Sequence, residues 1–131
     1  SINDLIVAPN RLVYGLAGSS LFAFDPVTRE IKDLKPFPIS AAQYNSIAVG
    51  PDGRLWGLAS SGVFAIDTAT NTAVLAAQAP EKITAGFAVD SAGIYFASVA
   101  KVYRYNFPVA GPGDSPTRGK KSTENGSRRR R

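Results

Sequence analysis

The stretch VAPNRLVYGLAGSSLFAFDPVTREI (residues 7–31) recurs without a gap as VGPDGRLWGLASSGVFAIDTATNTA (residues 49–73). Ten of the twenty-five aligned positions are identical, and others are conservative, such as Tyr14 and Trp56. The chain therefore repeats with a period of 42 residues. A period near 40 that is built from short strands is typical of the blades of a β-propeller.

A third, more divergent copy follows the first two. It aligns when one residue is deleted between Val99 and Ala100. The matched residues are Val89, Gly93, Phe96, Val102, Tyr103 and Asn106, opposite Val49, Gly53, Trp56, Val63, Phe64 and Asp67 respectively. This alignment predicts that Phe96 takes the place of Trp56.

One repeat contains the signals of four short strands. Residues 46–50 form an apolar run that ends in Pro51-Asp52-Gly53, and Asp-Gly is a strong hairpin signal because Gly accepts the positive φ of a tight turn. Residues 54–59, 63–67 and 72–76 are the next three predicted strands. Asn71 precedes the last one and tolerates the left-handed conformation. No helical period runs free of Gly, Pro or Asp-Gly breaks, so the sequence predicts an all-β fold.

The predicted architecture is about three four-stranded antiparallel blades, at residues 4–34, 46–76 and 86–106 within a propeller region 1–107. Small residues (Gly15, Gly57, Ala97) follow the large aromatics Tyr14, Trp56 and Phe96, which we expect to fill the core between blades. The third copy stops before a fourth strand. Closed propellers have four to eight blades, so we expect an incomplete ring. Either the chain is a fragment of a longer propeller, as the absence of Met also favours, or chains self-associate, two of them giving six blades.

The charge is concentrated at the C-terminal end. Residues 1–107 carry eight basic and eight acidic groups, whereas the whole chain has 15 and 10, so the net charge of +5 lies in residues 108–131. This segment is rich in Pro, Gly and Ser and ends in four arginines. It lacks the apolar residues needed to offset its ordering entropy, which predicts a disordered tail. The four arginines are the one feature that would attract nucleic acid. No aromatic residue is interleaved with them to stack on bases, and apart from this tail a nucleic-acid partner is not favoured.

Several kinds of chemistry are excluded by composition. The chain has no His and no Cys, which removes the Ser-His-Asp and Cys-His nucleophilic arrangements and the usual zinc sites. No apolar run approaches 18 residues, so no membrane span is predicted. Asp25, Asp67 and Asn106 recur at one position of the repeat. We interpret them as acceptors for the backbone of the following turn rather than as metal ligands, and we predict no metal site.

Loops at one end of the predicted channel are the expected place for a ligand. The loops that enter each inner strand (35–45 and 77–85) gather there with the loops that join the second and third strands. The most site-like residues are Gln43, Tyr44 and Asn45, which combine an aromatic face with amide groups. Lys82 occupies the comparable connector. These four residues are the predicted ligand-binding set, and no catalytic residue is predicted.

The segment Ile47-Ala48-Val49-Gly50-Pro51-Asp52-Gly53-Arg54-Leu55-Trp56 resembles the strand pair of propellers of the NHL, SMP-30 (gluconolactonase) and streptogramin-lyase types. Residues 23–28 and 65–70 are similar to the A-x-D-x-x-T-G run of quinoprotein-like repeats. They depart from that run because its Gly is Arg29 or Asn71 and its later Trp is Asp33 or Leu75. No cofactor is therefore predicted, and the resemblance implies a fold but no catalytic residue.

Two classes of function follow from this reading. The absence of His and the sparse acidic residues favour a non-catalytic binding or interaction module, or a fragment of one, that presents channel-mouth loops to a protein or glycan. The alternative is a fragment of a propeller enzyme, such as a metal-dependent lactonase or a lyase, whose active site lies in other blades. Fold alone does not decide between them.

Overall fold

The computed structural model describes residues 1–37 and 45–108, and these contain eleven β-strands and no helix. Within these residues the expectation of an all-β fold is confirmed. The predicted disordered tail, residues 108–131, lies outside the described residues apart from Pro108. The strands are β1 (Asp4–Val7), β2 (Val13–Ala17), β3 (Ser20–Asp25), β4 (Glu30–Pro36), β5 (Ile47–Val49), β6 (Leu55–Ala59), β7 (Gly62–Asp67), β8 (Thr72–Gln78), β9 (Ala85–Val89), β10 (Gly93–Ala97) and β11 (Val102–Asn106).

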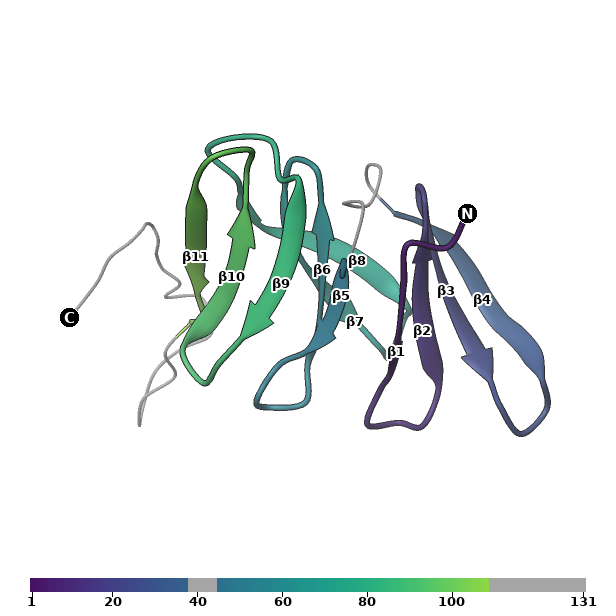
Figure 1. Cartoon of the computed structure of the whole chain (residues 1–131). Coiled ribbons are helices and arrows are strands. Elements are labelled where there is room, and N and C mark those ends of the chain that lie inside the picture. Colours follow the sequence, from purple (N-terminus) through teal and green to yellow (C-terminus); the bar gives the residue numbers. More distant parts are fainter. Residues whose placement is uncertain (38–44, 109–131) are drawn as a thin grey trace.

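The strands form three antiparallel sheets that follow one another along the chain (Figure 1). Sheet 1 is β1–β4 and sheet 2 is β5–β8, each in sequence order, and sheet 3 is β9–β11. Every pairing joins strands that are neighbours in the sequence, as tight turns between short strands favour. The first strands of successive sheets contact each other, β1 with β5 and β5 with β9. The three sheets thus stack face to face, with their first strands side by side along one edge of the stack.

Each sheet has two faces that the strand register distinguishes, and we name them by their contents. The front face of sheet 1 holds Leu5, Gly15 and Phe22, which are aligned across three strands, and that of sheet 2 holds Ile47, Gly57 and Phe64. The back face carries the side chains that alternate with these. Its members are Tyr14, Leu16 and Leu21 in sheet 1, Trp56, Leu58 and Val63 in sheet 2, and Tyr95, Ala97 and Val102 in sheet 3.

Two apolar cores fill the spaces between the sheets. The back face of sheet 1 packs on the front face of sheet 2, in a cluster that includes Tyr14, Leu16 and Leu21 from one side and Ile47 and Phe64 from the other. The second core joins the back face of sheet 2 to the front face of sheet 3. It contains Trp56, Leu58, Val63, Ile94 and Phe96. The prediction that Tyr14 and Trp56 are core residues is confirmed, since they are 0% and 1% exposed.

The alignment of the third repeat was wrong at the aromatic position. Val89 pairs with Ile94 and Ala88 with Tyr95, just as Val49 pairs with Leu55 and Ala48 with Trp56. Tyr95, not Phe96, therefore takes the place of Trp56 on the back face.

The deleted residue lies in the β9–β10 turn rather than between Val99 and Ala100. In that turn the Asp90 amide donates to the Gly93 carbonyl, whereas in the β5–β6 turn the Gly50 amide donates to the carbonyl of Arg54, one residue farther on. The third repeat is thus one residue shorter in the turn of its first hairpin, between β9 and β10.

This correction also moves the small position of the repeat. Gly57 lies under Phe37, whose ring carbon would approach an added Cβ to 3.2 Å, and Phe37 packs on Phe64 with ring centroids 5.1 Å apart. In sheet 3 the place of Gly57 is taken by Phe96, and Ala97 is not the small position. The connector residue that corresponds to Phe37 is Ala79, which packs against the cluster containing Phe96. Large and small side chains have exchanged places, so the space between the sheets stays filled.

The turns follow their residue types. Gly53 has φ 87° and Asn71 has φ 55°, so both take the left-handed conformation that the sequence predicts. Arg29, which corresponds to Asn71, has φ 65°. The Asp25 carboxylate accepts a hydrogen bond from the Val27 amide and the Asp67 carboxylate one from the Ala69 amide, both at 2.8 Å. The predicted turn role of these two aspartates is confirmed.

Candidate functional site

Connectors and turns meet at one end of the three sheets, the end predicted to hold a ligand (Figure 1). The Phe37 amide donates to the Ser19 carbonyl at 2.7 Å, and the Ala79 amide donates to the Ser61 carbonyl at 2.8 Å. These two bonds are one repeat apart, and each holds the start of a connector against the turn between the second and third strands. The Ile83 amide adds a bond of 2.8 Å to the Ser60 carbonyl. We call this end the loop end.

The four predicted ligand-binding residues have different outcomes. Gln43 and Tyr44 lie outside the described residues. Asn45 is exposed, and its side-chain amide donates to the carbonyl of Gly86 in β9 at 3.4 Å, which links the start of β5 to sheet 3. Lys82 is exposed in the connector between β8 and β9. Asn45 thus supports the backbone, and Lys82 offers a cation to solvent.

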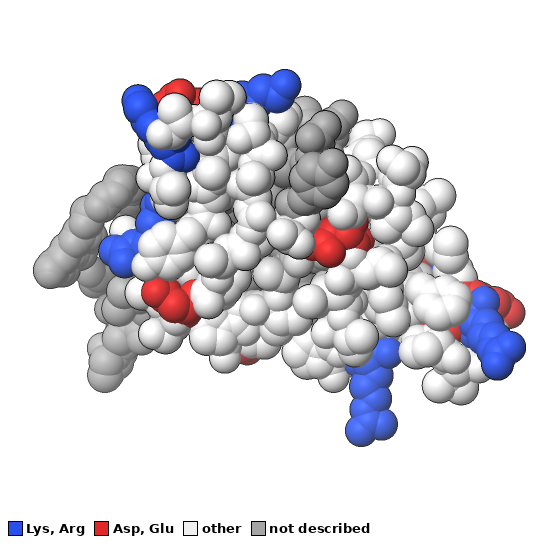
Figure 2. All heavy atoms as spheres, viewed as in Figure 1, with Lys and Arg blue, Asp and Glu red and all other residues white. Residues whose placement is uncertain are grey.

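A charged cluster beside Lys82 was missed by sequence reasoning. Glu81 accepts a hydrogen bond from the Tyr103 hydroxyl and pairs with Lys101, whose Nζ lies 3.2 Å from its carboxylate. The sequence alignment places Tyr103 only opposite Phe64, which is an apolar core residue. Glu81 and Lys101 are twenty residues apart in different loops, and no local pattern links them. Figure 2 shows charged side chains gathered at this end of sheet 3, at the upper left.

The cluster has a definite protonation pattern. The hydrogen bond from Tyr103 lowers the pKa of Glu81, with a smaller contribution from Lys101. The same bond raises the pKa of Tyr103, and the pairing with Glu81 raises the pKa of Lys101. At neutral pH the cluster therefore holds one carboxylate, one ammonium and one phenol that keeps its proton. It can bind a partner through charge and hydrogen bonds, and Lys82 adds a second ammonium.

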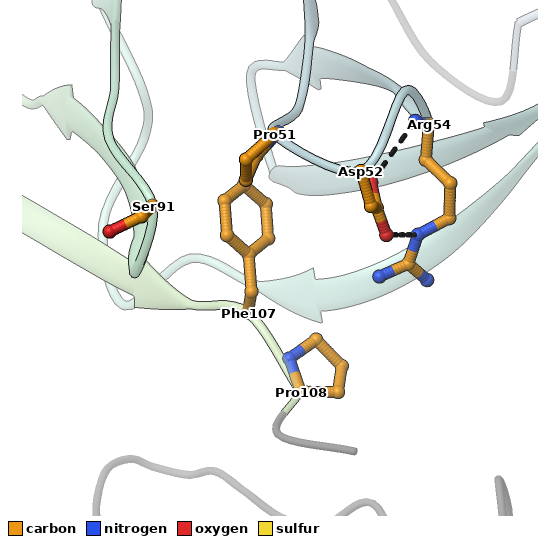
Figure 3. Close-up of a pocket in the computed structure, with 6 residues that line it drawn as sticks. All are labelled: Pro51, Asp52, Arg54, Ser91, Phe107 and Pro108. Atoms are coloured by element: carbon orange, nitrogen blue, oxygen red, sulfur yellow. Dashed lines mark hydrogen bonds and ion pairs between the residues drawn. The ribbon is translucent and has the colours of Figure 1, made fainter. Parts of the chain in front are cut away.

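A shallow hollow of about 190 Å³ lies at the opposite end, between the β5–β6 and β9–β10 turns (Figure 3). Phe107 points toward Pro51 there, while Arg54 lies to one side. The Arg54 Nε donates to the Asp52 carboxylate at 2.6 Å, and its guanidinium sits 5.2 Å from the centre of the Trp56 ring. The lining residues are Pro51, Asp52, Arg54, Ser91, Phe107 and Pro108.

The charged groups of this hollow are already engaged. The hydrogen bond from the Arg54 backbone amide lowers the pKa of Asp52, and the Arg54 side chain adds to this effect. Asp52 therefore belongs to its hairpin, as the sequence predicted, with the Arg54 amide donating to Oδ1 at 3.1 Å. The cation and the carboxylate satisfy each other here, whereas Lys82 at the loop end forms no ion pair with a described residue, so the loop end is the stronger candidate for a ligand.

The described residues lack two kinds of feature. Within residues 1–37 and 45–108, no group of three or more His, Cys, Asp or Glu side chains is placed to hold a metal ion. In the same part of the chain there is no helix with the length and apolar character needed to cross a membrane.

Comparison with known proteins returned no match. No family model, no curated protein and no solved structure is significantly similar to this chain.

Proposed function

We propose that this chain is a three-bladed arc of a β-propeller that works as a non-catalytic interaction module and binds a protein partner at its loop end. Three antiparallel meanders in sequence order, stacked face to face with contacting first strands, support the propeller assignment. The resemblance of residues 47–56 to NHL-type strand pairs points the same way.

The observation that carries the binding role is the construction of the loop end. Backbone hydrogen bonds from Phe37, Ala79 and Ile83 fix the described parts of the connectors against the turns, so Glu81 and Lys82 are held on a rigid scaffold. Lys82 and Lys101 present two ammonium groups beside the single carboxylate of Glu81. This balance favours a partner with exposed carboxylates, which would meet Lys82 and compete for Lys101.

Site-specific photocrosslinking from each end tests the proposal. A photoreactive residue placed at Lys82 should capture a protein from the source cells, in a reaction that excess unlabelled chain suppresses. The matched control carries the same photoreactive residue at Ser91, in the hollow at the opposite end. It should capture no protein whose crosslinking is suppressed by excess unlabelled chain.

Charge reversal gives the second arm. Lys82→Glu should weaken binding of the captured partner by about tenfold, because a repelling carboxylate replaces the attracting ammonium. Equal capture from both ends, or unchanged affinity of the Lys82→Glu variant, would contradict binding at the loop end. Selective binding of the chain to an uncharged glycan on an array would replace the protein partner by a carbohydrate.

A further inference from the structure

The interface between sheets occurs twice within the chain with the same construction. In both cases the back face of one sheet covers the front face of the next. No other described sheet covers the front face of sheet 1. The back face of sheet 3 is likewise uncovered by any described sheet. One molecule thus exposes both halves of an interface that it already builds internally.

The uncovered front face of sheet 1 exposes apolar side chains whose counterparts in sheet 2 are more buried. Leu5 is 50% exposed, whereas its counterpart Ile47, covered by sheet 1, is 3% exposed. Val7 and Ile31 are 66% and 58% exposed, and their counterparts in sheet 2 are partly buried. Val7, Val13, Phe24 and Ile31 form one row across the four strands of this face, and exposed apolar side chains that share a sheet face are typical of an interaction surface.

The outer strand supplies an internal control for this comparison. Leu34 in β4 is 64% exposed, but Leu75, at the same place in the covered face of sheet 2, is still 55% exposed. The outer strands therefore splay away from the interface even where two sheets are packed. The difference between the faces resides in the inner strands and in Ile31.

The back face of sheet 3 carries the complementary residues. Tyr95 stands where Tyr14 and Trp56 stand. Val102 is 75% exposed, whereas Leu21 and Val63, which hold the same place in the other two sheets, are each 1% exposed. A side chain that is buried in two copies of the repeat is thus left in solvent in the third.

Arg104 is a charged residue on this back face, at a position that is apolar in the other two sheets. It pairs with Tyr95 at a place where sheets 1 and 2 have alanine. Its guanidinium lies 5.9 Å from the centre of the Tyr95 ring and donates to the Tyr95 hydroxyl at 3.4 Å. The arginine therefore lies along the aromatic ring of this face instead of leaving a lone charge over it.

We propose that two copies of this chain associate head to tail, with the back face of sheet 3 in one copy covering the front face of sheet 1 in the other. The joint is heterologous, because two different faces meet, and two such joints related by a two-fold axis close the assembly. The closed dimer has six sheets, a number that β-propellers adopt. This inference rests on the packing of the sheets and is independent of the ligand at the loop end.

Light scattering coupled to size exclusion, on the full chain over a dilution series, is the first test. A discrete species of twice 13.8 kDa that dissociates on dilution is expected. Val7→Asp, on the front face of sheet 1, should raise the dissociation constant at least about tenfold, since it buries a carboxylate in the joint. Val74→Asp is the matched control, because Val74 is 59% exposed on β8 of the middle sheet and lies on neither free face.

Mixing two variants tests the direction of the joint. Val102→Asp should weaken the dimer as Val7→Asp does, so at a concentration where the wild-type chain is dimeric each variant alone should be monomeric. Mixed together, they retain one intact front face and one intact back face, so a one-to-one complex should form at high concentration. Circular dichroism of each variant checks that it is folded, as expected for side chains that are exposed in the monomer.

Three results would overturn the proposal. The first is a wild-type chain that stays monomeric at all concentrations. The second is a dimer that Val102→Asp leaves intact, because that would mean that two front faces meet. The third is a failure of the mixed variants to associate. None of these results bears on crosslinking at Lys82, so the two proposals fail separately.

Discussion

The Tyr14 hydroxyl of sheet 1 donates a hydrogen bond of 2.6 Å to the side-chain oxygen of Asn71, in the β7–β8 turn of sheet 2. Asn71 in turn donates to the Asp33 carboxylate at 2.8 Å, which leads the chain of bonds back to sheet 1. Asn10 donates to the same tyrosine oxygen at 3.1 Å. Burial raises the pKa of Tyr14, which therefore keeps the proton it donates.

The second interface uses the same place with different chemistry. Trp56, the counterpart of Tyr14, packs its ring 5.1 Å from that of Phe107 and 5.6 Å from that of Tyr105. Its indole nitrogen is buried and makes no hydrogen bond with any described residue. One inter-sheet joint thus combines an apolar core with a polar chain of bonds, and the other relies on aromatic contacts.

Removing the hydroxyl of Tyr14 should weaken the first joint. We expect Tyr14→Phe to lower the free energy of unfolding by about 1–3 kcal/mol, because Asn71 loses a buried hydrogen-bond partner. Urea denaturation followed by tryptophan fluorescence measures this change. Tyr95→Phe is the matched control, since its hydroxyl bonds lie at the surface, and it should change stability by less than about 0.5 kcal/mol. Equal effects of the two variants would show that the Tyr14 bond is not a stabilising link.

Glycine substitutions at the two equivalent turn positions should differ in sign. Arg29→Gly should be neutral or stabilise the fold by up to about 1 kcal/mol, because an exposed side chain leaves a left-handed position. Asn71→Gly also relaxes the backbone but removes the bonds to Tyr14 and Asp33, so it should destabilise by about 1–3 kcal/mol. Thermal unfolding of both variants checks the pair. A stabilised Asn71→Gly variant would contradict the role of this side chain.

Phe37 should be essential to the first core although it lies outside any strand. It is 2% exposed and covers Gly57 and Phe64. Phe37→Ala should cost about 3–5 kcal/mol of stability, because it leaves a cavity between two sheets. Val27→Ala, at a side chain that is 89% exposed, should cost less than about 0.5 kcal/mol. A small effect of Phe37→Ala, measured by chemical denaturation, would mean that the connector does not close the core.

Acid should destabilise the fold through its turn carboxylates. Hydrogen bonds from the amides of Ala92 and Gly93 lower the pKa of Asp90, whose ordinary value is 3.8. A lowered pKa in the folded state means that stability is present above the ordinary value and is lost as pH falls through the folded-state value. The melting temperature should therefore fall below about pH 4. Asp90→Asn should make this fall shallower, and an identical acid profile for variant and wild type would exclude the contribution of Asp90.

Alkaline loss of stability has the opposite sign. The pKa values of Tyr14 and Tyr103 are raised above the ordinary value of 10.0, the first by burial and the second by the bond to Glu81. Their contribution is complete below pH 10.0 and is lost as pH rises through the folded-state values. Ultraviolet titration should show a fraction of the tyrosines that loses its protons at higher pH than the rest. This fraction should disappear in the Tyr14→Phe, Tyr103→Phe double variant.

The candidate site was only partly open to prediction. The repeat predicted that connectors and turns gather at one end of the sheets. The backbone hydrogen bonds from Phe37 and Ala79 to the turns between the second and third strands agree with this prediction. The cluster of Glu81, Lys101 and Tyr103 did not follow, because its members come from different loops and meet only when sheet 3 folds. Whether Asn45 faces a ligand or the backbone depends on where β9 lies.

The sequence by itself determined the features that local chemistry controls. The period of 42 residues, the strands and their order, the Gly53 and Asn71 turns and the aspartate caps all depend on residues close together in the chain. Backbone conformation and short hydrogen bonds decide these features, and no distant contact is needed.

Only the tertiary structure decided which side chains meet across the sheets. The register of β9 against β10 put Tyr95 rather than Phe96 on the back face, because a shift of one residue in a strand moves every side chain to the other face. The exchange of Phe37 and Gly57 for Ala79 and Phe96 likewise depends on the packing of two sheets and a connector. Such contacts join residues far apart in the chain, and their volumes are set by the space between the sheets.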